Sequence, residues 1–130
     1  MQAQVTIERV SFFADARGWV VEPVAEETIR SQRNVHVVFT EPGHVRGNHY
    51  HEQTTEIVLV MGPALVRFQE GGATRDVQVP DGEALRFVFP PGIPHAIKNT
   101  GNRPAVLTSF DDRPHDRVKP DTIRAVLIEG

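Results

Sequence analysis

The chain has no cysteine among its 130 residues, and this absence excludes several kinds of chemistry. A disulfide scaffold, a thiolate nucleophile, an iron–sulfur cluster and a Cys-ligated zinc site all need cysteine sulfur. Any metal bound by this chain must therefore be held by histidine and carboxylate groups. A chain of this length can bury a core without disulfide bonds, so we expect one domain spanning residues 1–130.

Lysine and net positive charge are also scarce. Lys98 and Lys119 are the two lysines, and the formal net charge at pH 7 is -3. Binding to nucleic acid generally needs a basic face, which this composition does not provide. We therefore expect no nucleic-acid partner.

Long hydrophobic runs are missing as well. No apolar stretch approaches the roughly 20 residues that span a bilayer, and the first five residues lack the charged head and apolar core of a signal peptide. We expect a cytoplasmic protein that does not associate with membranes.

No segment shows a sustained apolar stripe with the 3.6-residue period of a helix. Short runs rich in Val, Ile, Phe and Leu instead recur between Gly, Pro, Asn and Asp, a pattern typical of a β-sandwich or barrel. We predict an all-β domain, with a helical turn at most in residues 24–33. The predicted strands span residues 5–10, 19–23, 34–40, 47–51, 55–61, 64–70, 74–79, 84–89, 95–99 and 105–110.

Two further predictions concern the ends of this pattern. Residues 122–128 become apolar after a polar tail, so we expect them to pack back on the barrel or against a second subunit. Trp19 is the one tryptophan, and we expect it in the core, where a lone tryptophan of a small domain usually lies. Stacking on a base or sugar is the alternative for Trp19.

The residues most informative for function are three histidines and a glutamate. His49 and His51 are two positions apart, so on a strand both imidazoles lie on one face and Tyr50 lies on the other. Glu56 opens an apolar run and shares a face with valines, where a carboxylate is costly unless it is paired or binds a metal. His95 opens another predicted strand directly after a Pro-Gly turn.

Three imidazoles and one carboxylate suit Zn, Fe, Mn, Ni or Cu, with one or two coordination positions left open. We predict that His49, His51, Glu56 and His95 bind one divalent transition metal ion (Zn, Fe, Mn or Ni). The alternative is a hydrogen-bonded His/Glu cluster without a metal.

These residues resemble the two sequence motifs of the cupins. The first motif is matched by Gly43, His49, His51, Glu56 and Gly62, with one residue fewer than usual before the last glycine; the second is matched by Pro90, Gly92, His95 and Asn99. The resemblance covers roughly residues 34–110. It implies a cupin double-stranded β-helix, a jelly-roll barrel, with the four residues above as metal ligands.

A narrower similarity points to nucleotide sugars. Residues 46–51, 64–68 and 120–122 look like the cupin domains of bifunctional capsular-polysaccharide enzymes that epimerise a UDP-4-keto-6-deoxy-hexosamine, and residues 15–19 look like the entry segment of dTDP-4-keto-sugar 3,5-epimerases. The similarity implies a nucleotide-sugar substrate and a homodimer. Those 3,5-epimerases use a tyrosine as acid, whereas Tyr50, the one tyrosine here, is predicted to point away from the ligands.

Three arginines are candidate substrate-binding residues. Arg46 precedes His49 near the expected mouth of the site, and Arg17 lies in the epimerase-like segment; either suits a diphosphate, and a solvated loop arginine is the alternative for both. Arg67 lines the barrel lumen or faces solvent on the opposite side. The other histidines, His36, His44 and His115, are interpreted as structural or solvated.

Three functions remain open at this point. The leading hypothesis is an epimerase or isomerase acting on a nucleotide-linked 4-keto-6-deoxy sugar in polysaccharide biosynthesis, where a metal or an arginine stabilises the charge that develops on the ketone oxygen. The second is a non-haem metal dioxygenase or a small-molecule lyase, since the same ligands leave room for oxygen or a chelating substrate. The third is a sugar- or effector-binding protein without turnover.

Overall fold

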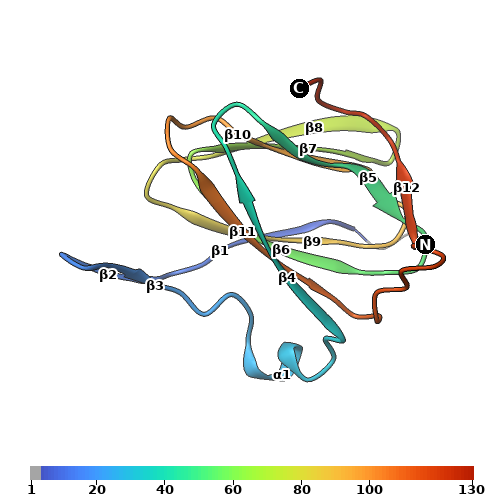
Figure 1. The fold of residues 1–130 in the computed structure, drawn as a ribbon, viewed down its shortest axis with the longest axis horizontal. Coiled ribbons are helices and arrows are strands. Elements are labelled where there is room, and N and C mark those ends of the chain that lie inside the picture. Colours follow the sequence, from blue (N-terminus) through green and yellow to red (C-terminus); the bar gives the residue numbers. More distant parts are fainter. Residues whose placement is uncertain (1–3) are drawn as a thin grey trace.

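The computed structural model describes residues 4–130, which form short strands and one helical turn (Figure 1). In chain order the elements are β1 (Thr6–Arg9), β2 (Phe13–Asp15), β3 (Gly18–Val20), α1 (Glu26–Ile29), β4 (Asn34–Thr40), β5 (Val45–His51), β6 (Glu56–Met61), β7 (Ala64–Glu70), β8 (Ala73–Val79), β9 (Ala84–Phe89), β10 (His95–Asn99), β11 (Ala105–Asp111) and β12 (Thr122–Arg124). The all-β prediction is confirmed. Within these residues, no helix is long and apolar enough to cross a membrane.

Two antiparallel five-stranded sheets face each other across the core (Figure 1). One has the strand order β1-β9-β6-β11-β4 and the other β12-β5-β10-β7-β8. Most consecutive strands from β4 to β11 alternate between the two sheets, so the chain crosses from one layer to the other and closes a jelly roll. This confirms the double-stranded β-helix that the sequence motifs imply.

The core lies between the inner faces of the two sheets. Alternate residues of β6 and β7, such as Val58, Val60, Val66 and Phe68, are at most 2% exposed and contact one another in a single apolar cluster. Each side chain of this size contributes about 1.5–3 kcal/mol of hydrophobic stabilisation when buried. The resulting rigid barrel positions the polar groups at its ends.

Strand β5 contains a bulge directly before its two histidines. His95 of β10 lies opposite His49 and Ala96 lies opposite Gly47, so Asn48 is an extra residue in β5. Gly47 and Asn48 both have positive φ, 83° and 57°. A Cβ on Gly47 would lie 2.8 Å from the carbonyl oxygen of His95, so the strands approach this closely only because the residue is glycine.

The C-terminal segment packs on the barrel, as one of the two alternatives predicted. Strand β12 pairs with β5, and the Asn48 side chain holds the residues that follow it. Its Nδ2 donates to the carbonyl of Ile128, at 2.9 Å, and its Oδ1 accepts from the backbone N–H groups of Leu127 and Ile128. Asn48 is therefore a structural anchor for the C-terminal segment.

The N-terminal part departs from prediction in two respects. The strand predicted at residues 19–23 is the shorter β3, which pairs with the unpredicted β2 in a hairpin that extends away from the two sheets (Figure 1). Trp19 lies on this hairpin and is 52% exposed, so the prediction that it lies in the core is wrong. The helical turn predicted at residues 24–33 is confirmed by α1.

Candidate metal centre

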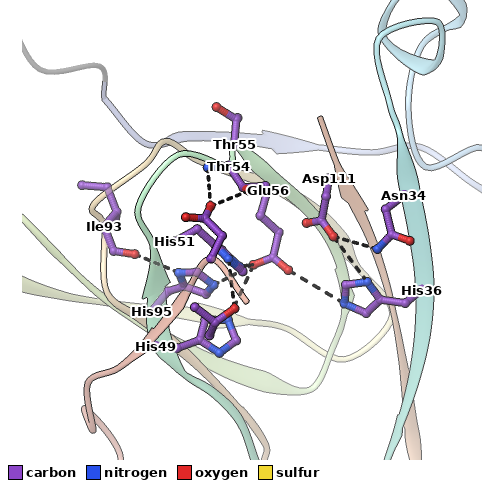
Figure 2. Close-up of polar contacts among 12 residues, drawn as sticks. Asn34, His36, His49, His51, Thr54, Thr55, Glu56, Ile93, His95 and Asp111 are labelled. Carbon is purple, nitrogen blue, oxygen red and sulfur yellow. Dashed lines mark hydrogen bonds and ion pairs between the residues drawn. The ribbon is translucent and has the colours of Figure 1, made fainter. Parts of the chain in front are cut away.

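Four side chains from three strands converge inside one end of the barrel (Figure 2). His49 and His51 come from the end of β5, Glu56 is the first residue of β6, and His95 is the first residue of β10. One potential ligand atom from each lies within 4.8 Å of those of the other three. These are the four residues that the sequence predicts as a metal shell, and the antiparallel pairing of β5 with β10 brings His95 directly opposite His49.

The ring of His95 is held in one orientation. It stacks on Phe89, with ring centroids 4.2 Å apart and planes 3° from parallel, and it is 2% exposed. Its Nδ1 lies 2.9 Å from the carbonyl oxygen of Ile93, which fixes the Nδ1–H tautomer in a neutral ring. The other nitrogen, Nε2, is then directed at Oε1 of Glu56, 2.7 Å away.

Glu56 is the charged centre of the group. It is 5% exposed, and its Oε1 lies 3.5 Å from Nε2 of His51 and 4.0 Å from Nε2 of His49. Burial acts to raise the pKa of Glu56, but the surrounding imidazoles outweigh it and hold that pKa well below its usual range. The carboxylate is therefore ionised and available as a ligand at neutral pH.

The two histidines of β5 present unpaired nitrogens to this carboxylate. Nε2 of His49 and Nε2 of His51 are buried and have no hydrogen-bond partner among residues 4–130. Burial acts to lower the pKa of His51, but Glu56, Asp111 and Asp121 raise it above its usual value. Buried imidazole nitrogens facing an ionised carboxylate fit a divalent transition metal, which binds neutral imidazole and carboxylate oxygen.

Arg46 lies at the barrel edge and is engaged with strand β4. Its guanidinium donates to the carbonyl oxygen of Phe39, at 2.6 Å, and to Oγ1 of Thr40, at 3.2 Å. Because of the bulge after it, Arg46 lies opposite the buried Ile97 in the β5–β10 pairing. Arg46 and His49 therefore share a face of β5, whereas strict alternation without the extra residue would place them on opposite faces.

The other two arginine candidates are not brought to the four-residue group. Arg17 forms an ion pair with Asp15 in the β2–β3 hairpin, and its side chain is 87% exposed. Arg67 lies between the core residues Val66 and Phe68, so alternation turns it to the outer face of β7, where it pairs with Asp76. The lumen placement considered for Arg67 is therefore not the one observed.

His36 and Asp111 form a polar pair beside the group that the sequence did not reveal. Nε2 of His36 lies 3.9 Å from Oε2 of Glu56, and its Nδ1 lies 3.7 Å from Oδ2 of Asp111 (Figure 2). His36 was interpreted as structural or solvated. The available signal was alternation on β4, which puts His36 on the same face as Val38, a residue packed against the core.

A polar cavity of about 360 Å³ opens next to the group. It is lined by His51 and Asp111, by residues of the β5–β6 loop, and by the segment that runs from the end of β11 to the start of β12. The charged residues on that segment include Arg113, Asp116, Lys119 and Asp121. One of the four candidate metal ligands, His51, therefore lines the cavity, which carries groups of both charges.

Comparison with known families gives a match over most of the chain. The family described as polysaccharide biosynthesis C-terminal domain matches residues 13–123. A UDP-2-acetamido-2,6-beta-L-arabino-hexul-4-ose reductase from Pseudomonas aeruginosa is 36% identical over 93 residues. That alignment covers 68% of this chain and 25% of the relative, so the chain spans about a quarter of the relative's length.

Solved structures share the fold at low identity. A dTDP sugar isomerase from Desulfovibrio desulfuricans has a TM-score of 0.76 at 19% identity, covering 93% of this chain and 83% of its own. The sugar 3,4-ketoisomerase QdtA from Thermoanaerobacterium thermosaccharolyticum, in complex with TDP, has a TM-score of 0.71 at 16% identity and coverages of 95% and 90%. The capsular polysaccharide assembling protein CapF from Staphylococcus aureus has a TM-score of 0.67 at 24% identity, covering 91% and 34%.

Proposed function

Because the chain belongs to the family of polysaccharide biosynthesis C-terminal domains, which confirms the resemblance found in the sequence, we propose that it is an epimerase or isomerase of nucleotide sugars. The substrate would be a nucleotide-linked 4-keto-6-deoxy sugar. The observation that carries the proposal is the group of three histidines and a glutamate beside a polar cavity that His51 lines and that is large enough for a hexose. The names of the relatives, a hexulose reductase and sugar isomerases, support this substrate class.

His49, His51, Glu56 and His95 would hold one divalent metal ion in this proposal. Such an ion supplies Lewis-acid stabilisation of the negative charge that develops on a ketone oxygen when the adjacent carbon loses a proton. The chemistry of the donor set and the unpaired nitrogens of the two β5 histidines support this assignment.

The protein's own groups prepare this end of the barrel for such a reaction. The carbonyl of Ile93 and the ring of Phe89 fix His95, and the paired strands fix the two β5 histidines relative to it. The apolar core below, including Phe68 and Phe87, keeps water out of the inner side of the site. Preorganised polar groups in a site of low dielectric stabilise developing charge more strongly than they would in water.

Proton exchange tests the proposal directly. The protein, loaded with metal, is incubated in heavy water with UDP- and dTDP-4-keto-6-deoxy sugars, and the recovered sugars are examined by mass spectrometry and NMR. We expect deuterium at a carbon next to the ketone, and much slower incorporation with His51→Ala. No incorporation with any such substrate contradicts the proposal, and a clear thermal shift with the ligand recovered unchanged favours a binding protein without turnover.

We also propose that two copies of the chain form a dimer through the outer face of β4 and the β2–β3 hairpin. Val35, Val37 and Phe39 alternate on that outer face and are 51%, 67% and 54% exposed. On the hairpin, Phe13 and Val20 are 63% and 68% exposed. Strand β4 ends its sheet in the described part of the chain, and apolar edge strands are usually covered by a partner.

A further inference from the structure

Asp111 is a buried carboxylate with one oxygen engaged and one free. It is the last residue of β11, lies opposite Glu56 in the β11–β6 pairing and is 9% exposed. Its Oδ2 accepts a hydrogen bond from Nδ2 of Asn34, at 3.0 Å, and lies 3.7 Å from the His36 ring (Figure 2). Its Oδ1 has no hydrogen-bond partner among the described residues.

The unpaired oxygen belongs to a residue of the cavity wall. Asp111 lines the polar cavity together with His51, one of the four candidate ligands. Two other carboxylates of the same cavity are engaged by the chain itself. Asp121 accepts from the backbone N–H groups of Gln53 and Thr54, and Asp116 accepts from those of Val118 and Lys119. Asp111 therefore retains an unused acceptor. This oxygen is buried, so a ligand in the cavity reaches it only when the side chains around it shift.

The chemistry of this acceptor restricts what it binds. A buried carboxylate oxygen without a donor costs free energy, and an ionised carboxylate only accepts hydrogen bonds. It therefore suits a hydroxyl or an amide N–H and repels a phosphate. The cations of the same cavity, Arg113 and Lys119, suit the phosphates.

We propose that Asp111 is a substrate-binding residue whose Oδ1 accepts a hydrogen bond from a ring hydroxyl or an acylamino N–H of the sugar. The inference rests on the proposed nucleotide-sugar function and adds a recognition contact to it. Asn34 holds the other carboxylate oxygen and so directs Oδ1. With the sugar at Asp111 and the phosphates toward Arg113 and Lys119, the sugar ring lies beside His51, at the candidate metal group.

The test compares a sugar nucleotide with its nucleotide alone. Titration calorimetry measures the affinities of UDP and of a UDP-4-keto-6-deoxy sugar for the wild type and for Asp111→Asn. In the variant the amide oxygen stays with the Nδ2 donor of Asn34, so an NH2 group takes the place of Oδ1 and cannot accept from the sugar. A hydrogen bond to a charged group is worth about 1.5–3 kcal/mol, so the sugar nucleotide should bind roughly 10- to 100-fold more weakly to the variant. Affinity for UDP should stay within about twofold, because UDP lacks the sugar that Asp111 would contact.

Asp112→Asn is the matched control. Asp112 is the next residue, is exposed, and uses its Oδ1 to accept the N–H of Thr55, which an asparagine oxygen also accepts. This variant should bind the sugar nucleotide as the wild type does. Equal affinities for the sugar nucleotide in wild type and Asp111→Asn overturn the inference.

The experiments distinguish failure of the proposed sugar contact at Asp111, called the subsite below, from failure of the proposed function. Deuterium incorporation by the wild type with unchanged affinity in Asp111→Asn removes the subsite and keeps the function. Loss of sugar affinity in the variant without any incorporation by the wild type keeps the subsite and removes the function. If Asp111→Asn does not fold, a crystal structure of the wild type with the sugar nucleotide decides: a sugar oxygen or nitrogen within about 3 Å of Oδ1 is expected, and a ring turned away overturns the inference.

Discussion

His95 shows at the scale of one residue why the four-residue group suits a cation. Each of its ring nitrogens faces an oxygen, the carbonyl of Ile93 on one side and the carboxylate of Glu56 on the other. A neutral imidazole donates from one nitrogen only. With Nδ1–H donated to Ile93, Nε2 directs a lone pair at a carboxylate. A proton or a metal ion between the two groups relieves that repulsion.

The first prediction concerns metal content. The wild type should bind about one divalent ion per chain, since the four groups form one shell. His51→Ala and Glu56→Ala should lower the affinity by roughly 100-fold, because each removes one of four ligands from a binding free energy of several kcal/mol. Metal analysis after dialysis and competition with a chelator measure both quantities.

His44→Ala is the control for this prediction. His44 is an exposed residue outside the strands, so its loss should leave the metal content unchanged. Equal metal content in the wild type, His51→Ala and Glu56→Ala would defeat the proposed shell.

At the scale of elements, the contact of β5 with β10 determines the geometry of the group. The bulge at Asn48 lets Gly47 pack against the backbone of His95 and still leaves His49 opposite His95. A second element, the turn between β5 and β6, is held by Asp121 from the C-terminal segment, which accepts hydrogen bonds from Gln53 and Thr54. Both features join segments that are distant in the sequence.

Gly47→Ala should therefore destabilise the protein more than Gly43→Ala does. Both glycines have φ near +80°, where an L-residue costs about 1–2 kcal/mol. At Gly43 a Cβ meets no atom within 4 Å in the described chain, whereas at Gly47 it meets the His95 carbonyl at 2.8 Å. Urea unfolding of the metal-free proteins gives the difference. Equal losses in the two variants would contradict the close contact of β5 and β10.

Asp121 makes the stability depend on pH in the acid range. Burial acts to raise its pKa, but hydrogen bonds from Thr54 and from the backbone of Gln53 outweigh it, so its folded pKa is lowered from 3.8. A group whose pKa is lower in the folded state stabilises the protein at pH values above its unfolded-state pKa. This stabilisation is lost as the pH falls through the folded-state pKa. The difference in unfolding free energy between wild type and Asp121→Asn should therefore shrink as pH falls from 5 to 3. A difference that stays constant over this interval would show that ionised Asp121 does not hold the turn.

At the scale of the whole molecule, the exposed apolar residues are distributed unevenly. Most of the large ones lie on the outer face of β4 or on the β2–β3 hairpin, whereas the outer face of β8, with Thr74, Asp76 and Gln78, is polar. Exposed apolar surface of this kind usually marks an interface. The uneven distribution supports a dimer formed through β4 and the β2–β3 hairpin.

The dimer prediction has a matched pair of variants. Light scattering of the wild type should give about twice the chain mass of 14.5 kDa. Val37→Asp, which places a charge on the outer face of β4, should give the mass of one chain because a charge buried without a partner is costly. Val118→Asp is the control, since Val118 is 95% exposed in the segment between β11 and β12. A monomeric wild type contradicts the proposal.

Most of the strands and the composition of the four-residue group were predictable from the sequence, because both depend on local patterns. Apolar alternation and turn residues repeat over a few positions, so ten of the strand regions could be located before any pairing was known. The spacing of His49 and His51 places both on one face of a strand, whatever that strand pairs with. The three-residue strands β2 and β12 were missed, because so few residues show no period. The equally short β3 was located only within a longer predicted run at residues 19–23.

The tertiary structure alone decided what depends on contacts between distant segments. The bulged residue Asn48 makes hydrogen bonds to residues about 80 positions away in the sequence. The bulge also determines on which face of β5 Arg46 lies. The free oxygen of Asp111 is recognisable only once Asn34, 77 positions earlier, is seen to occupy the other one. The sequence by itself determined the fold class and the four candidate ligands, since periodicity and spacing are local. The pairing register decided which other side chains surround them, because that register comes from the packing of the whole barrel.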